Sequence, residues 1–424
     1  MSQLNRSPYI FKTILAIAVT TAMMSSVHAA TDKEEIQKLR QEVEALKSLI
    51  QQQHQVQQQQ QVQLTQVQAQ PAAVASPQMG LKSKAGAEVN LYGFVRGDAN
   101  YIIEGADDDF NSVGKVGAGG NNPGSVEDKL RATAKTTRLG LDFKTKVEGA
   151  DVGGKVEVDF AGANEALRIR HAYITLNNWL FGQTTSNFLS SHAPEMIDFG
   201  TNVGGGTARI PQVRYSHKLA PNTLLLVSAE EGNSTASGSG LKYRLPNLTA
   251  KVTQGFADGK GNASARALIE NYKSETVNDD QIGWGVAAGA NYQVTDPFKV
   301  SADVSYVKGN SNYLYGSNSA YSIVNGDIEQ NEFVGVQVGA TYKILPNLRS
   351  TLAYGALFAD NGTDYAKANA TSANEKVQQA WINFIYSPVK PVDLGVEYVN
   401  GKRETFSGSS FKDNRIGLMA KYNF

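Results

Sequence analysis

The chain ends in RIGLMAKYNF, residues 415–424, a stretch in which apolar side chains occupy every second position. Successive side chains of an extended strand point to opposite faces. One face would therefore carry the apolar residues Ile416, Leu418, Ala420, Tyr422 and Phe424. The other would carry Arg415, Gly417, Met419, Lys421 and Asn423. This alternation predicts a β-strand between lipid and a watery lumen, and its alternative is a half-buried edge strand of a soluble sheet.

The opposite end of the chain resembles an export signal. Arg6 and Lys12 precede an apolar run at 14–19, and the small residues around Ala29 indicate a cleavage site. We therefore expect residues 1–29 to be a signal peptide. No later segment reaches the roughly 20 apolar residues that a membrane-spanning helix needs, so membrane insertion would have to use strands.

The composition excludes several classes of site. The chain has no cysteine, which excludes disulfides and thiolate metal sites, and neither a metal nor a cofactor is expected. The chain has 40 basic residues (Lys and Arg) and 40 acidic residues (Asp and Glu), so its formal net charge is zero. This balance argues against a nucleic-acid partner. Any selectivity must therefore come from where the charges lie.

Residues 30–70 carry a helical pattern. Apolar side chains recur at steps of three and four, as in the heptads of a coiled coil, at Ile36, Leu39, Val43, Leu46 and Ile50. Opposite charges five residues apart on the flanks fit pairing between neighbouring chains. We therefore expect a coiled coil that forms a homo-oligomer. A lone amphipathic helix with a solvated, glutamine-rich tail would show the same pattern.

After a proline-containing linker at 71–88, the rest of the chain, 89–424, alternates between strand-like runs and turns. Short turns are predicted at 148–151, 177–178, 220–222, 245–247, 295–297, 345–347 and 387–391. Long Gly/Asn/Asp/Ser segments, expected to be loops, lie at 105–128, 184–208, 258–280, 309–331 and 360–375. This asymmetry predicts an all-β transmembrane barrel of about 16 antiparallel strands, with about 18 as the alternative.

The alternation also predicts which side chains face the lumen. A charge on the lipid face near the midplane costs roughly 2–4 kcal/mol, so charged strand residues are assigned to the inside. Five arginines from the first six strands would converge there: Arg96, Arg138, Arg168, Arg170 and Arg214. Around 168–173, Ile169 and Tyr173 would face lipid, and His171 has the same lipid-facing parity.

An arginine-lined wall would attract small anions, because guanidinium groups stay charged and bind carboxylate or phosphate with paired donors. The alternative is that the arginines form ion-pair ladders that brace the barrel, with the partners Asp98, Asp142, Glu157 and Asp159. Further basic side chains that could reach the lumen are Arg209, at a loop end, and Lys144, Lys242, Arg244 and Arg415.

Several of these motifs resemble those of known porins. The segments 137–141 (TRLGL) and 167–173 (LRIRHAY) resemble the basic second and fourth strands of general trimeric porins, and 181–184 (FGQT) resembles the start of their third loop. The terminal Tyr422 and Phe424 resemble the assembly signal of outer-membrane barrels. Together with the predicted coiled coil, the whole mature chain resembles the DcaP-type porin family.

The resemblance implies a homotrimer in outer-membrane lipid, inserted by the barrel-assembly machinery, with its coiled coil in the periplasm. It implies a channel for small anionic solutes such as dicarboxylates, in which Glu195 and Asp198 of the third loop face the arginines across a constriction. A phosphate-selective porin and a structural or adhesive barrel tethered by the coil are the alternatives. An enzyme is not expected, because His192 and His217 lack a neighbouring triad signature.

Overall fold

The structure, a computed structural model, describes residues 81–84, 86–117, 125–200, 202–238 and 240–424. The predicted signal peptide at 1–29 and the predicted coiled coil at 30–70, with its five apolar heptad residues, lie outside the described residues. The predicted linker at 71–88 is described from residue 81, where it contains the short strand β1 (Leu81–Lys82). The described residues contain no helix that is long and apolar enough to cross a membrane.

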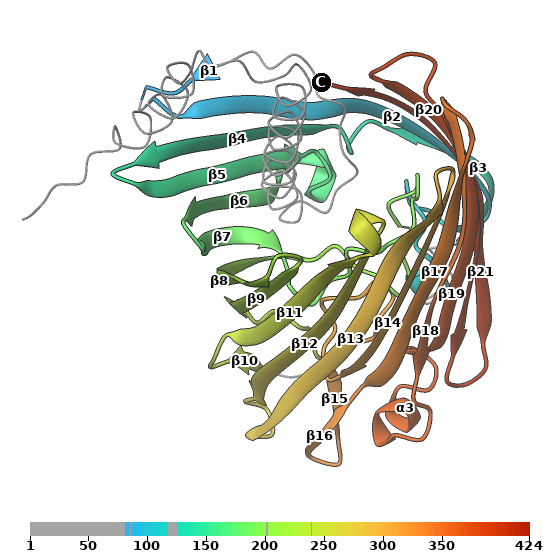
Figure 1. The fold of residues 1–424 in the computed structure, drawn as a ribbon. Coiled ribbons are helices and arrows are strands. Elements are labelled where there is room, and N and C mark those ends of the chain that lie inside the picture. The colour runs from blue at the N-terminus through green and yellow to red at the C-terminus, as the bar shows by residue number, and fades with distance from the viewer. Residues whose placement is uncertain (1–80, 85, 118–124, 201, 239) are drawn as a thin grey trace, which may run out of the picture. The chain divides into compact units, whose positions relative to one another are not determined.

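The described chain forms an antiparallel sheet that closes into a barrel (Figure 1). The wall has sixteen strands, as predicted. Two of them are interrupted and are each divided into two elements, β3 (Ser125–Thr133) with β4 (Arg138–Val147) and β10 (Leu241–Tyr243) with β11 (Asn247–Phe256). The others are β2 (Glu88–Ala106), β5 (Ala150–Asp159), β6 (Arg168–Leu176), β7 (Trp179–Thr185), β8 (Arg209–Ala220), β9 (Thr223–Glu230), β12 (Gly261–Ser274), β13 (Asp279–Thr295), β14 (Phe298–Lys308), β17 (Glu332–Leu345), β18 (Leu348–Ala359), β19 (Asn374–Tyr386), β20 (Val392–Thr405) and β21 (Ser410–Asn423).

The barrel closes between β2 and β21, the first and last wall strands. The backbone N–H of Phe424 donates to the carbonyl of Gly93 at 3.0 Å, and the N–H of Gly93 donates back at 3.1 Å. Ile416 and Leu418 are exposed on the outer face of β21, whereas Arg415 is fully buried on the inner face. The terminal stretch 415–424 is therefore the closing strand of the barrel, with the predicted alternation.

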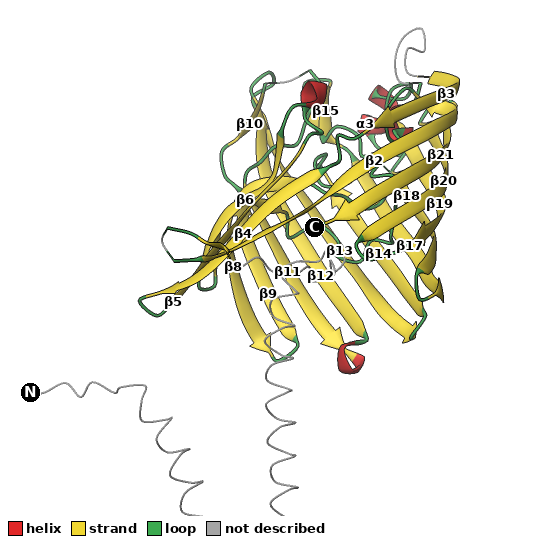
Figure 2. Cartoon of the chain, turned by 90° about the horizontal axis from the view of Figure 1, so that it is seen from above, coloured by secondary structure: helices red, strands yellow, loops and turns green. Residues whose placement is uncertain are grey.

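Short turns and long loops lie at opposite ends of the wall. The predicted turns at 148–151, 177–178, 220–222, 295–297, 345–347 and 387–391 all join neighbouring strands. The long loops contain the hairpin β15 (Tyr321–Val324) with β16 (Asp327–Gln330), the helix α3 (Asp364–Ala368) and the short 3-10 turns η1 (Val113–Lys115) and η2 (Ala163–Glu165). Figure 2 shows β15 and α3 at this loop end. In barrels of this kind the short turns are periplasmic and the long loops extracellular, which orients the wall.

The predicted turn at 245–247 and the predicted loop at 258–280 are both wrong, and the two errors cancel in the strand count. β10 and β11 both pair with β12, so the residues between them interrupt a single strand. Pro246 has no N–H to give to the ladder, which explains the interruption. The actual turn contains η3 (Ala257–Gly259). β12 was missed because its outward residues include Ala265 and Ala267, whose small side chains make the apolar alternation weak.

A β-bulge in β6 changes the side of the wall that its residues face. Glu157 of β5 pairs with His171, but Val158 pairs with Ile169, so Arg170 is an extra residue on β6. Such a bulge shifts the alternation of the strand by one residue. Side chains on the two sides of Arg170 therefore no longer share a simple period of two.

Because of this bulge, the lipid-facing assignments of Tyr173 and His171 are wrong. Ile169 is 54% exposed, as predicted, but beyond the bulge Ile174 takes the lipid-facing position, at 55% exposed. Tyr173 lies opposite the buried Lys155. His171 also faces the lumen, and its Nδ1 lies 2.9 Å from the hydroxyl of Thr184.

Candidate functional site in the barrel lumen

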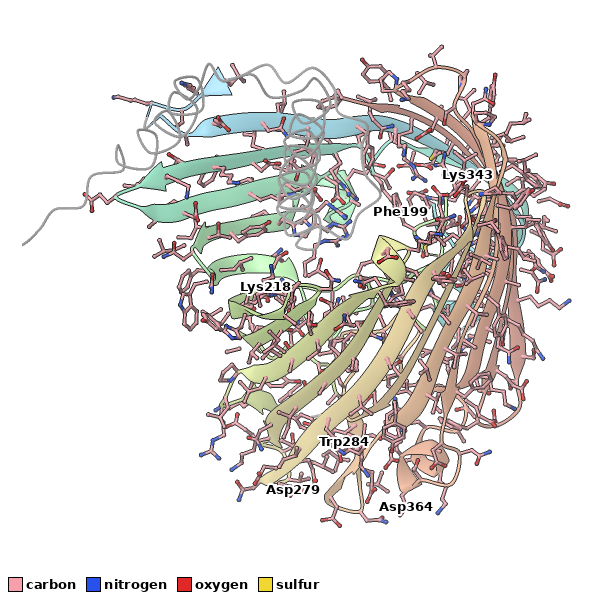
Figure 3. All side chains as sticks on the ribbon, viewed as in Figure 1. Phe199, Lys218, Asp279, Trp284, Lys343 and Asp364 are labelled. Carbon is pink, nitrogen blue, oxygen red and sulfur yellow. The ribbon has the colours of Figure 1, made fainter. Side chains whose placement is uncertain are left out.

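Loop 186–208, which follows β7, folds into the barrel and lies against its inner wall. The hydroxyl of Ser190 donates to Asp303 on β14 at 2.6 Å. Further along the loop, the backbone N–H groups of Ile197 and Asp198 donate to Glu397 on β20 at 2.9 and 2.8 Å. Figure 3 shows Phe199 of this loop inside the ring of strands. The loop therefore narrows the lumen over the strands from β14 to β20.

A cluster of arginines lies on β4 and β6, beside two carboxylates of β5. Glu157 accepts a hydrogen bond from Arg170 at 2.7 Å and lies 3.4 Å from Arg138. Asp159 accepts two bonds from Arg168, at 2.9 and 2.7 Å, and one from Arg170 at 2.9 Å. Bidentate pairs of this kind hold guanidinium groups in fixed orientations. The ion-pair ladder is therefore present, yet three arginines share two carboxylates.

Arg209, the first residue of β8, adds a fourth guanidinium to this region. It lies within electrostatic range of Arg138 and Arg170, and its buried Nε has no hydrogen-bond partner. Arg209 forms no ion pair within the described part of the chain. We call Arg138, Arg168, Arg170 and Arg209 the arginine cluster. Its charge exceeds that of the two carboxylates, so it can bind a further anion.

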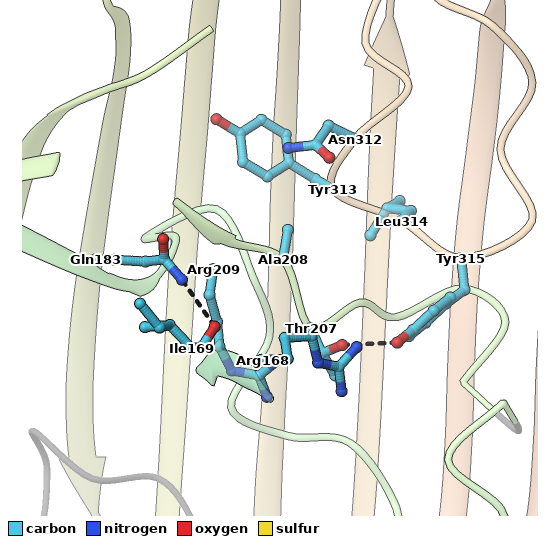
Figure 4. A pocket seen from close by; sticks show the side chains of 10 residues that line it. All are labelled: Arg168, Ile169, Gln183, Thr207, Ala208, Arg209, Asn312, Tyr313, Leu314 and Tyr315. Atoms are coloured by element: carbon cyan, nitrogen blue, oxygen red, sulfur yellow. Dashed lines mark hydrogen bonds between the residues drawn. The ribbon is translucent and has the colours of Figure 1, made fainter. Parts of the chain in front are cut away.

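A cavity of about 280 Å³ lies beside this cluster, between loop 186–208 and loop 309–331 (Figure 4). Arg168 and Arg209 line it from the wall, and Thr207, Asn312 and Tyr315 line it from the loops. The hydroxyls of Thr207 and Tyr315 are 2.7 Å apart, so the two loops touch at its edge. We call this space the upper cavity. Its guanidinium, hydroxyl and amide groups are all suited to hydrogen-bonding an anion.

The other predicted arginines have different partners. Arg96 pairs with Asp98 at 2.6 Å and donates to the carbonyl of Ile197 at 2.5 Å, so it holds the inward loop. Arg214 donates to Gln212 at 3.0 Å and to a backbone carbonyl, without a carboxylate among the described residues. Arg415 is fully buried and pairs with Asp413 at 2.8 Å. The five predicted arginines therefore do not form one cluster.

The two acidic residues of the inward loop also differ from the expectation. Glu195 forms a bidentate pair with Arg349 of β18, at 2.8 and 2.8 Å. Asp198 is 2% exposed and accepts bonds from the N–H groups of Asn111 and Gly200 at 2.9 and 2.8 Å. Burial raises the pKa of Asp198 to about 6. Asp198 therefore faces loop 107–117 and not the arginine cluster, and of the predicted arginines Arg415 acts on its charge.

Three further predicted contributors lie near strand ends. Lys144 is exposed toward the short-turn end of β4, opposite Glu88. Lys242 is exposed at the loop end and pairs with Glu275. Arg244 is exposed at the interruption between β10 and β11. None of these three contacts the arginine cluster in the described structure.

Sequence patterns gave no signal for several residues of the site. Thr207, Asn312 and Tyr315 belong to long loops, in which no period relates a side chain to the wall. Arg349 lies on a strand but acquires its role only through the loop residue Glu195, which is far away in sequence. The described residues hold no group of three His, Cys, Asp or Glu side chains placed to bind a metal ion.

A closed sixteen-stranded barrel with a basic lumen and an inward-folded loop is the architecture of an outer-membrane channel of the porin class. A family model of the DcaP outer membrane protein matches residues 15–424. The chain therefore belongs to the DcaP outer membrane protein family, and it is a channel and not an enzyme.

Solved structures agree with this assignment. The crystal structure of the outer membrane channel DcaP of Acinetobacter baumannii is 70% identical, with a TM-score of 0.78, and the match covers 81% of this chain and 99% of that one. OmpT of Vibrio cholerae is 14% identical, with a TM-score of 0.53 and coverages of 82% and 100%. An anion-selective porin from Comamonas acidovorans is 12% identical, with a TM-score of 0.53 and coverages of 80% and 100%. The last two show a shared fold alone. The comparison with curated proteins found no match.

Proposed function

We propose that this channel prefers anions and passes small negatively charged solutes, dicarboxylates among them. The observation that carries the proposal is the charge imbalance of the arginine cluster. Its four guanidinium groups have only Glu157 and Asp159 as ion-pair partners in the described structure. Two of the four, Arg168 and Arg209, line the upper cavity, where a solute that enters from the loop end would meet them.

The proposed mechanism is passive diffusion and needs no chemical step. Basic groups on the wall of a narrow lumen raise the local concentration of anions and exclude cations. Arg168 already donates two hydrogen bonds to Asp159, so fewer of its donors are left for a passing carboxylate. Arg209 forms no ion pair in the described structure, so it supplies the stronger attraction. Binding that is favourable but incomplete lets the solute leave again, as conduction requires.

Reversal potentials of the full-length protein in planar bilayers, under a tenfold KCl gradient, test the anion preference. Replacing the cations that line the upper cavity, in Arg209→Gln and in Arg168→Gln/Arg209→Gln, should lower the chloride-to-potassium permeability ratio by about twofold or more. Lys402→Gln, which removes an exposed charge at the loop end of β20, is the matched control and should leave the ratio unchanged. Cation preference of the unaltered channel would contradict the proposal.

Blocking titrations distinguish the solutes. Succinate and inorganic phosphate, added separately to the loop-end side, should both interrupt the current, and we expect succinate to do so at the lower concentration. Tighter block by phosphate would support the alternative of a phosphate-selective porin. A closed, non-conducting barrel would support the structural or adhesive alternative.

The proposed assembly is a homotrimer joined through the periplasmic coiled coil at 30–70, after removal of residues 1–29. The heptad pattern supports the coil, and the porin class supports the trimer. Deleting residues 30–70 should lower the fraction of trimer that survives detergent extraction. Unchanged trimer yield would show that the barrel associates without the coil.

A further inference from the structure

A second group of basic side chains lies on the inner wall, nearer the short turns than the upper cavity. Arg214 is on β8, further along the strand than Arg209, and the separation is roughly 16 Å at about 3.3 Å per residue. Lys251 lies on β11 and pairs with Leu226 of β9, whereas Arg214 pairs with Ser228 of the same strand. Lys251 is therefore slightly nearer the short-turn end of the wall than Arg214. Lys299 is near the start of β14, beside the periplasmic turn. We call these three residues the lower cluster.

All three members of the lower cluster point to the lumen. Arg214 shares its face of β8 with the buried Gln212. Lys251 lies directly opposite the buried Arg266 of β12. Lys299 shares its face of β14 with the buried Asp303. Side chains directly opposite each other, or an even number of residues apart on a regular strand, face the same side.

No member of the lower cluster forms an ion pair in the described part of the chain. Glu230 is within electrostatic range of Arg214, but its carboxylate accepts hydrogen bonds from Ser228, Thr249 and Tyr313. Arg214 donates only to the Gln212 side chain and the Thr185 carbonyl, and Lys251 donates to the carbonyl of Leu189 at 3.1 Å. The nearby carboxylate of Asp303 is occupied by Arg266, at 2.7 and 2.6 Å. Donors of both Arg214 and Lys251 are therefore left for another acceptor.

His192 of the inward loop lies among these charges and does not alter their balance. Burial, and then the positive charges of Lys251, Arg266 and Lys299, lower the pKa of His192 to about 3. Its ring is therefore neutral at pH 7, and its Nε2 lies 2.8 Å from the hydroxyl of Ser264. Three cations therefore act on the position of His192, and in the described structure only Arg266 among them forms an ion pair.

We infer that Arg214, Lys251 and Lys299 form a second anion-binding site, on the periplasmic side of the upper cavity, for the same small carboxylate solutes. The inference rests on the proposed anion preference. It adds that a solute meets two binding sites in sequence, the upper cavity first and the lower cluster second. A solute leaves the Arg168–Arg209 pair at the loop end, passes the inward loop and is held again before the short turns. Successive weak sites of this kind let one bound ion displace the next.

Lys251 could instead serve only to fasten the inward loop through the Leu189 carbonyl. Two substitutions separate these roles. Lys251→Gln removes the charge but keeps an N–H donor for Leu189, whereas Lys251→Met removes both. A role in anion binding requires both variants to change solute binding, while a purely structural role requires that only Lys251→Met does.

The test is the rate at which succinate, added to the short-turn side of single channels in bilayers, blocks the current. Arg214→Gln and Lys251→Gln should each lower this rate severalfold, because a steering charge is lost. The control is Lys421→Gln, which removes a cation that is paired with Asp393 at 3.0 Å in the same half of the barrel, and it should change the rate little. All three variants should stay anion-preferring in a KCl gradient, because the arginine cluster at the upper cavity is intact, and the chloride-to-potassium ratio should fall more in Arg214→Gln and Lys251→Gln than in Lys421→Gln.

Two results would overturn the second site while leaving the proposed function intact. One is an unchanged blocking rate in both glutamine variants of an anion-preferring channel. The other is an effect of Lys251→Met with none of Lys251→Gln. A cation-preferring unaltered channel would overturn the proposed function itself, and the second site with it, and the reversal potential reports this outcome before any block is measured.

Discussion

At the scale of single residues, the pair between Glu195 and Arg349 shows how the inward loop is held. Arg349 donates two hydrogen bonds to the Glu195 carboxylate. The Glu195 carbonyl also accepts bonds from Trp381 and Asn383, both at 3.0 Å. Side-chain and main-chain contacts therefore fix the same loop residue to β18 and β19.

Removing this ion pair should loosen the loop without releasing it. We expect Arg349→Gln to raise the mean conductance slightly and the open-channel noise clearly, because Trp381 and Asn383 still hold the backbone of Glu195. Single-channel recording measures both. The double variant Glu195→Gln/Arg349→Gln should change the conductance and the open-channel noise no more than either single variant, because the effects of two residues that act as a pair are not additive. Strictly additive effects would show that the two side chains act independently.

Asp107, in the loop after β2, gives a prediction about pH. The hydrogen bond from Lys129 lowers the pKa of Asp107, against an opposing effect of burial and with help from Arg131. The folded-state pKa is thus below the unfolded value of about 3.9, so the stabilisation is complete above that pH and is lost as the pH falls below it. Hydrogen exchange of residues 107–117, corrected for intrinsic rates, should therefore rise between pH 5 and pH 3.

The matched control for this prediction is Asp107→Asn, which has no carboxylate to titrate. Its corrected exchange should depend less on pH than that of the unaltered chain. Equal pH dependence in the two proteins would assign the loosening of the loop to other groups.

At the scale of elements, the inward loop approaches β18 so closely that a side chain would not fit between them. A Cβ at Gly355 would lie 2.1 Å from the carbonyl oxygen of Val203. Gly355→Ala should therefore push the loop off the wall and lower the stability of the folded barrel by about 1–3 kcal/mol, as overpacking does. Heat-modifiable gel mobility across a temperature series measures this change.

Gly97→Ala is the control, because a Cβ at Gly97 would meet no atom within 4 Å. We expect it to leave the unfolding temperature unchanged. A similar loss in both variants would mean that alanine disturbs these strands generally, and that the close approach of the loop is not the cause.

The elements also show where prediction from alternation works and where it does not. The outward faces of β13 and β17, with their exposed Trp284, Val286 and Val338, follow from the period of two. The bulge at Arg170 does not, because one extra residue shifts the alternation without changing the composition. Likewise, the proline at 246 looks like a turn in sequence, and only the pairing of β10 and β11 with the same strand shows that it is not.

At the scale of the whole molecule, the barrel depends on the contact between its first and last strands. Phe424 contributes two main-chain hydrogen bonds with Gly93 and places its ring beside that glycine. Deleting Phe424 should lower the yield of heat-modifiable barrel several-fold, because the N–H and C=O of Gly93 lose their main-chain partners at the closing seam. Phe424→Ala keeps the main-chain bonds and should lower the yield less. An unchanged yield after the deletion would show that the other pairs of β2 and β21 suffice.

By itself the sequence determined the features that depend on neighbours along the chain: most of the extended strands, most of their lipid-facing residues, most of the short turns and the closing strand at 415–424. Only the tertiary structure decided which charges meet. The contacts of Asp198 with Asn111, of Glu195 with Arg349 and of Arg168 and Arg209 with one cavity join residues that lie far apart in the chain. Such contacts depend on strand register and on the path of the inward loop, and a local pattern of alternating side chains contains neither.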